Sequence, residues 1–112
     1  MPRGMKMGAK MMGPMTDPRS RFFMALASDQ RLRILELLKS GEKNSQEIIS
    51  ELLLDPSVVS RHMMMLRNIG LVEAYKQGVT MYFRIADARV FEIIETATNI
   101  TRDWLNKFQD FF

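Results

Sequence analysis

Apolar side chains through the middle of the chain recur at the three- and four-residue intervals of amphipathic helices, and this pattern predicts four helices. Two of them begin with an aspartate N-cap followed by a proline at the first helical position, at Asp17-Pro18 and at Asp55-Pro56. A third helix starts at Ser28 or Asp29 and ends at Gly41. The remaining helix opens at Asn44, which is spaced from the glutamate three residues later as in a capping box.

After Gly70 the spacing of apolar residues changes. Residues 71–76 and 80–85 are rich in β-branched and aromatic side chains, and Gln77-Gly78-Val79 lies between them. This pattern predicts a β-hairpin with glycine in its turn. Asp87 is then the expected cap of a last helix of about five turns with a wide apolar stripe. The predicted fold is mainly α with a small β-hairpin (α+β), in one domain over residues 16–112.

The elements predicted over residues 45–85 follow the order of a winged helix-turn-helix: a short helix, a tight turn, a second capped helix and a hairpin. The second helix, from Pro56 to about Asn68, is the candidate recognition helix. Its apolar residues Val59, Met63 and Leu66 recur at helical spacing and are expected to face the core. Its N-terminus and opposite face present the residues expected to reach DNA: Pro56, Ser57, Val58, Ser60, Arg61 and His62.

These residue types suit the major groove. Short side chains let the end of the helix enter the groove, hydroxyls can bond bases or phosphates, and an arginine can fork onto guanine. The hairpin is the expected wing, with Lys76, Gln77 and Gly78 at its tip. His62 has two interpretations that stay open: it meets a phosphate, or it packs at the edge of the core and bonds the backbone.

The net charge of +3 arises in residues 1–15, which carry three basic side chains and no acidic one. The rest of the chain is neutral overall, so a DNA-binding surface has to come from local arrangement. Between Pro56 and Ala86, four basic residues stand against Glu73 alone; they are Arg61, Arg67, Lys76 and Arg84.

Residues 1–15 form a tail rich in Met, Gly and Lys, without a period, and we expect this tail to be flexible. Three interpretations stay open for it: a plain extension, a basic arm on DNA phosphates, and a Cu(I) site made of thioethers.

The chain has 112 residues, of which 46% are hydrophobic and 26% charged, ordinary values for one soluble domain. It contains no cysteine, which excludes disulfides and thiolate metal sites, and its single histidine argues against an all-protein zinc site. No apolar run is long enough to cross a bilayer, and the N-terminus lacks the apolar stretch of a secretory signal, so a cytoplasmic protein without membrane contact is expected. The sequence shows no paired nucleophile and base, no phosphate-binding loop and no metal cluster of the kind that enzymes use, and no cofactor is predicted.

Two segments carry a family resemblance. LASDQRLRILELL, at residues 26–38, and SVVSRHMMMLRNIGLVEAYKQGVTMYFRI, at residues 57–85, closely resemble the ArsR/SmtB family of winged-helix repressors. The resemblance covers roughly residues 20–95. It implies a homodimer built from the first and last helices, which binds a palindromic operator. It also implies that Pro56, Ser57, Ser60 and Arg61 contact the major groove.

The sequence departs from this family where metal is sensed. The positions of the family's Cys-x-Cys hold Asn44 and Gln46, and the last helix contains no histidine. The DNA-binding function is therefore expected to carry over without the cysteine metal-sensing site. A small-molecule inducer stays open and unidentified.

The last helix carries more apolar surface than a small monomer can bury, and a partner subunit is the expected cover. A ligand pocket between the two terminal helices is the alternative. The residues expected at a dimer interface lie on the first and last helices: Phe22, Phe23, Ile94, Ala97, Ile100, Trp104, Leu105 and Phe108.

We interpret the chain as a homodimeric, sequence-specific DNA-binding transcriptional regulator, in the role of a repressor. The alternative from another class is a winged helix that serves as a protein–protein interaction module. An interaction module is expected to expose apolar anchors on its second helix, whereas Ser57, Ser60 and Arg61 are polar. Those three positions therefore favour DNA.

Overall fold

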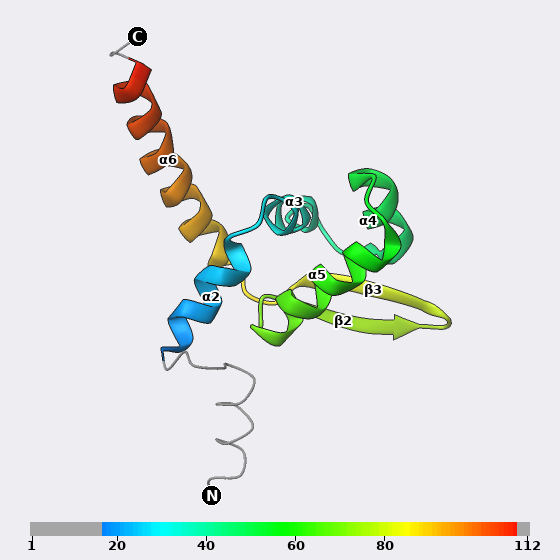
Figure 1. Cartoon of the computed structure of the whole chain (residues 1–112). Coiled ribbons are helices and arrows are strands. Elements are labelled where there is room, and N and C mark those ends of the chain that lie inside the picture. The colour runs from blue at the N-terminus through cyan, green and yellow to red at the C-terminus, as the bar shows by residue number, and fades with distance from the viewer. Residues whose placement is uncertain (1–16, 110–112) are drawn as a thin grey trace, which may run out of the picture.

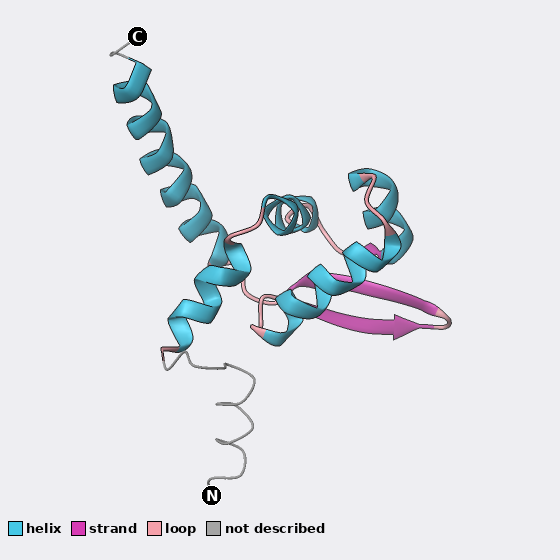
Figure 2. Cartoon of the chain, viewed as in Figure 1, coloured by secondary structure: helices cyan, strands magenta, loops and turns pink. Residues whose placement is uncertain are grey.

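The computed structural model describes residues 17–109, so the predicted tail at residues 1–15 and its open interpretations lie outside the described part. Within that part the chain forms five helices and a small sheet (Figure 2). The helices are α2 (Pro18–Leu26), α3 (Asp29–Leu38), α4 (Ser45–Leu52), α5 (Pro56–Asn68) and α6 (Val90–Gln109), and the strands are β1 (Lys43–Asn44), β2 (Val72–Gln77) and β3 (Thr80–Ile85).

Three of the predicted helix starts are confirmed by their caps. The side chain of Asp17 accepts a hydrogen bond from the Arg19 backbone N–H, and the side chain of Ser28 accepts one from the Arg31 N–H. Asn44 Oδ1 accepts from the Glu47 N–H at 2.9 Å while the Asn44 N–H donates to the Glu47 carboxylate at 2.8 Å. This reciprocal pair is the predicted capping box, and it satisfies two backbone groups that would otherwise lack partners.

One apolar core joins the helices to one face of the sheet. Ile34, Leu35 and Leu38 of α3 are buried at its centre. They pack with the remaining buried residues from α4, α5, the segment before β2, the sheet and the start of α6: Ile48, Leu52, Val59, Met63, Leu66, Leu71, Val72, Phe83 and Val90. The residues predicted to face inward on α5 are thus buried, and α3 holds the centre of the fold.

The sheet is antiparallel in the order β1-β3-β2, and its two long strands form the predicted hairpin. Gln77 pairs with Thr80, so the turn consists of Gly78 and Val79 alone and Gln77 belongs to the strand. Gly78 has a φ of 66°, which glycine adopts without strain, at the first central position of a two-residue turn. The two-residue strand β1, which pairs with β3, was not predicted from the sequence.

The last helix extends away from the rest of the molecule (Figure 1). The radius of gyration is 16.6 Å, above the ~13 Å expected for a compact domain of about 100 residues. α6 begins at Val90, three residues after the predicted cap; Asp87 bonds the Arg89 N–H and guanidinium, and this contact lowers the pKa of the Asp87 carboxyl to about 2. No helix in the described residues is long and apolar enough to cross a membrane.

Candidate nucleic-acid interface

Helix α5 presents a polar outer face beside the hairpin (Figure 1). Its N-terminal residues Pro56 and Ser57, and Ser60 and Arg61 one turn later, are exposed, whereas Val58 is half-buried. The opposite face of α5 packs into the core, which fixes the direction in which the outer face points. The structure therefore exposes four of the six residues of α5 that were predicted to reach DNA, whereas Val58 and His62 are half-buried.

The start of α5 differs from the prediction in one detail. Asp55 occupies the N-cap position, but its carboxylate makes no cap bond to the backbone. Asp55 Oδ2 instead accepts a hydrogen bond from the Ser57 hydroxyl at 3.2 Å. With its proton donated to Asp55, the Ser57 oxygen is oriented to accept a hydrogen bond from a partner outside the helix.

The predicted wing tip is exposed at all three predicted residues, Lys76, Gln77 and Gly78. Lys76 pairs with Met81 across the hairpin, so the cation lies on the sheet face that packs toward the helices. Val79 is 96% exposed at the end of the turn. This apolar tip was not singled out from the sequence, because a valine inside a β-rich segment has the signature of an ordinary strand residue.

The local excess of positive charge rests on three of the four basic residues, because the fourth, Arg84, is paired with Glu73. Arg84 Nε donates to Glu73 Oε1 at 2.9 Å, and this contact raises the pKa of the arginine. The pair lies on the sheet face turned away from the core, where Arg84 also stands over the Tyr75 ring. Among residues 17–109, none of the ion pairs found involves Arg61, Arg67 or Lys76. These three cations carry the basic character of the α5 and wing surface.

His62 lies half-buried between α5 and α3, and both of its ring nitrogens have partners. Nδ1 is 3.1 Å from a guanidinium nitrogen of Arg31, and Nε2 is 2.6 Å from Gln30 Oε1. Burial of the ring, with the nearby Arg31 and Arg61 cations, holds the pKa of His62 below its ordinary value. The ring thus packs at the edge of the core, but its partners are side chains of α3 and not backbone groups.

Neither Gln30 nor Arg31 was singled out from the sequence. Both lie in the first turn of α3, where polar residues are common and periodicity gives no sign of a long-range partner. Only the packing of α3 against α5 brings them to His62, which is 31 residues beyond Arg31 in the chain.

A second exposed surface is apolar and lies between α2 and α6. Every residue of α6 from Glu95 to Gln109 is exposed, and the rings of Trp104 and Phe108 stack at 5.7 Å. A groove of about 610 Å³ runs between the two helices. Six of the eight predicted interface residues are exposed, and Phe22 and Ile94 are half-buried; the exposed six are Phe23, Ala97, Ile100, Trp104, Leu105 and Phe108.

The described residues hold no group of three or more His, Cys, Asp or Glu side chains that is able to bind a metal ion. At the positions where the resemblance implies metal-sensing cysteines, the Asn44 amide accepts from the Glu47 N–H, and Gln46 is exposed. The side chain of Asn44 is thus already used as a helix cap.

Known proteins resemble this chain in sequence and in fold. Residues 28–74 match the family described as "Bacterial regulatory protein, arsR family". The chain is similar to a probable mercury resistance operon repressor of Streptomyces lividans, with 31% identity over 87 residues, 78% of this chain and 70% of that protein.

Two solved structures are similar as well. One is Rv0081 of Mycobacterium tuberculosis, with 31% identity and a TM-score of 0.72 over 80% of this chain and 90% of the other. The second is the homodimeric winged helix-turn-helix DNA-binding domain of Mb0332 of Mycobacterium bovis, a possible ArsR-family regulator. It is 31% identical, with a TM-score of 0.71 over 81% of this chain and 84% of that chain.

Proposed function

The chain belongs to the ArsR family of bacterial regulatory proteins, whose members are DNA-binding transcriptional regulators and not enzymes, and we propose that it represses transcription as a homodimer on a palindromic operator. The observation that carries this proposal is the outer face of α5, which presents Ser57, Ser60 and Arg61 to solvent beside a cationic wing. The proposed partner is double-stranded DNA in the cytoplasm.

In the proposed complex, α5 enters the major groove with its N-terminal half. Arg61 donates to a guanine edge, Ser57 accepts from a donor on a base, and Ser60 bonds bases or phosphates. Pro56 and Val58 flank these contacts at the start of the helix. Lys76, Gln77 and Gly78 of the wing follow the phosphate backbone, where a short polar tip approaches closely.

The proposed dimer forms when a second copy covers the apolar surface between α2 and α6. Exposed apolar patches of this kind mark interaction sites, and a two-fold axis gives each copy the same contacts. The two α5 helices would then enter successive major grooves, about 34 Å apart, which is why we expect a palindromic operator. The alternative is that the groove between α2 and α6 binds a small-molecule inducer.

One observation favours the alternative of a protein-interaction module. Met64 and Met65 of α5 are 59% and 44% exposed, so the helix is not entirely polar. Met64, however, lies among Ser60, Arg61 and Arg67 on the same helix, and a thioether among hydroxyls and cations suits a base edge such as a thymine methyl. We therefore keep DNA as the proposed partner.

Selection of duplexes from a random DNA pool, followed by a mobility-shift assay with excess non-specific competitor, tests the proposal. We expect one enriched sequence that the full-length protein shifts in the presence of competitor. If no sequence is enriched and the competitor abolishes every shift, the proposed function is wrong, and the interaction module becomes the better account.

A further inference from the structure

Arg31 uses each of its guanidinium nitrogens on a different partner. Nε donates to the Ala25 carbonyl at 2.7 Å and Nη2 to the Met24 carbonyl at 3.1 Å. Both carbonyls belong to the last turn of α2, where the helix dipole favours a cation; the Met24 carbonyl also accepts from the Ala27 N–H. Nη1 lies 3.1 Å from Nδ1 of His62 on α5. One side chain of α3 therefore holds the end of α2 and the middle of α5.

The contact between Arg31 and His62 determines which ring nitrogen of the histidine carries the proton. A guanidinium has only donors, so Nδ1 of His62 is the acceptor and carries no proton. The ring proton is then on Nε2, which donates to Gln30 Oε1 at 2.6 Å. His62 completes the contact only as a neutral ring.

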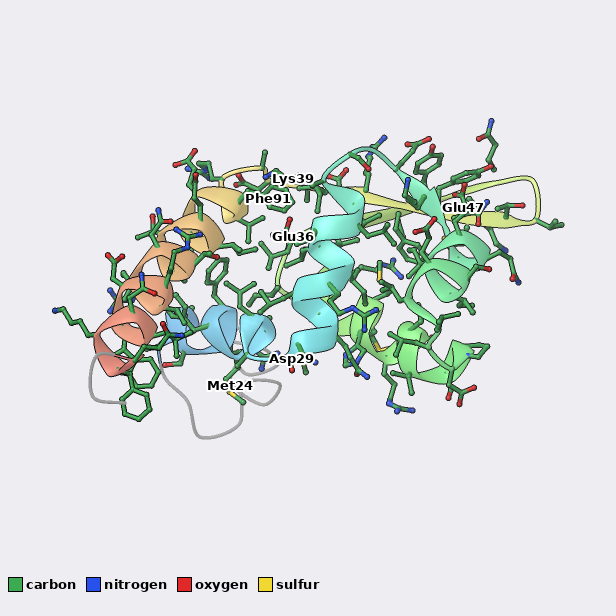
Figure 3. All side chains as sticks on the ribbon, turned by 90° about the horizontal axis from the view of Figure 1, so that it is seen from above. Met24, Asp29, Glu36, Lys39, Glu47 and Phe91 are labelled. Carbon is green, nitrogen blue, oxygen red and sulfur yellow. The ribbon has the colours of Figure 1, made fainter. Side chains whose placement is uncertain are left out.

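Figure 3 shows α3 between α2 and α6 on one side and α4 and α5 on the other, with Met24 close to the start of α3 at Asp29. His62 follows Arg61 directly in α5, so a movement of this part of the helix would move both His62 and the side chain that we propose to read DNA. We propose that Arg31 is a positioning residue, which through neutral His62 fixes α5 against the end of α2 in the orientation that specific DNA binding needs. This inference rests on the proposed function.

Protonation of His62 would break this contact. An imidazolium donates from both nitrogens, so Nδ1 would face the Arg31 guanidinium as donor against donor. The charged groups that act on the ring are Arg31 from α3 and Arg61 from α5 itself, and both are cations. Burial of the ring, together with these two cations, holds the pKa of His62 below its ordinary value, so the contact is intact at neutral pH and is lost on acidification.

The test uses the full chain and the duplex enriched from a random DNA pool at pH 7.5, with affinity measured by fluorescence anisotropy from pH 5.0 to 7.5. We compare the wild type with His62→Asn, because asparagine does not titrate and its Oδ1 can accept from Arg31 in place of Nδ1. For the wild type we expect affinity for the enriched duplex to fall about tenfold more than affinity for random DNA as the pH drops. For His62→Asn we expect the two affinities to change in parallel. An identical pH profile for both proteins would overturn the inference.

Arg31→Lys supplies a second measurement at pH 7.5. Lysine keeps the charge, but its three donors share one nitrogen, whereas Arg31 reaches its acceptors on two helices from three separate nitrogens. We expect at least a tenfold loss of affinity for the enriched duplex, with affinity for random DNA and the dimer retained. Arg33→Lys is the matched control, because Arg33 is exposed on the same helix. Equal affinities for both lysine variants would contradict the role of Arg31. If the Arg31→Lys protein fails to fold, the comparison of the wild type with His62→Asn across pH decides the question. Failure to enrich any duplex at pH 7.5 would instead contradict the proposed function, and with it this inference.

Discussion

Arg61 is the residue on which the proposed base reading depends most. It is exposed on the outer face of α5, and no ion pair found among residues 17–109 engages it. We expect Arg61→Ala and Ser57→Ala each to lower affinity for the enriched duplex by about 1–3 kcal/mol, the usual cost of a lost base contact. Thermal unfolding should be unchanged, because neither side chain is part of the core.

Fluorescence anisotropy and thermal unfolding of the same samples check this prediction. Arg33→Ala is the control, since it removes one exposed arginine from a helix that is not expected to read DNA. If both α5 variants bind as tightly as the control, the assignment of the contact residues is wrong.

His62 should also make stability depend on pH. Its pKa in the folded chain is below the ordinary value of 6.5, so below about pH 6.5 the unfolded chain binds more protons than the folded one. The free energy of unfolding is therefore expected to fall as the pH drops from 6.5 toward the lower folded pKa. Urea unfolding at pH 7.5 and 5.5 should show a larger loss for the wild type than for His62→Asn; an equal loss would mean that His62 does not contribute.

At the scale of elements, the wing is the part whose DNA contact is easiest to isolate. Lys76 is exposed near the tip and is expected to touch a phosphate. We expect Lys76→Ala to weaken binding to enriched and random duplexes alike, and to lower the slope of log K against log salt by about one.

A salt titration of both proteins measures these slopes. Lys107→Ala is the control, because Lys107 is exposed on the distal part of α6, far along the chain from the wing. Identical slopes for wild type and Lys76→Ala would place the wing tip away from the DNA.

The sequence predicted most elements well because local signals define them. The cap of α4, the proline at the start of α5 and the change to alternating spacing after Gly70 all act within a few residues. Strand β1 was not predicted, because two residues are too few to show an alternating pattern. The left-handed backbone of Leu53, with a φ of 54°, was not predicted either, because leucine rarely adopts that conformation. That leucine ends α4 in the left-handed conformation, the position where glycine is usual.

The candidate site was predictable only in part, for the same reason. Helical spacing alone separates the buried Val59 and Met63 from the exposed Ser60 and Arg61. The partners of His62 depend on how α3 packs against α5, and the Glu73–Arg84 pair depends on strand register. Neither kind of contact leaves a local pattern in the sequence.

At the level of the whole molecule, the exposed apolar residues of α6 indicate that two copies of the chain form a dimer. Trp104 is 60% exposed and does not belong to the core. We expect Trp104→Glu to convert a dimer into a folded monomer, because the substitution buries a charge at the proposed interface and leaves the winged part intact. Specific DNA affinity should fall with it.

Sedimentation analysis and circular dichroism check this outcome. Asn99→Glu is the matched control, because it adds the same charge to a different face of the same helix. A dimer that survives Trp104→Glu, or a wild type that is monomeric at micromolar concentration, would contradict the proposed interface.

DNA binding is further expected not to depend on transition metals or thiol redox state. The chain has no cysteine, and within residues 17–109 no metal-binding group of His, Asp or Glu is found. Affinity for the enriched duplex should change less than tenfold with Zn(II), Ni(II), Cu(I), chelator, oxidant or reductant, in a chain that begins at Met15. A larger change would be contrary to this prediction, whereas a Cu(I) effect seen only with the full chain would assign sensing to the tail.

A hydroxyl-radical footprint on the enriched duplex tests whether a dimer reads DNA through α5. We expect two protected patches related by a two-fold axis, with their centres about 34 Å apart along the duplex. We also expect Arg61→Ala to weaken both patches to the same extent at a concentration that just saturates the wild type. A single asymmetric patch, or protection that Arg61→Ala leaves unchanged, would contradict a dimer that reads DNA through α5.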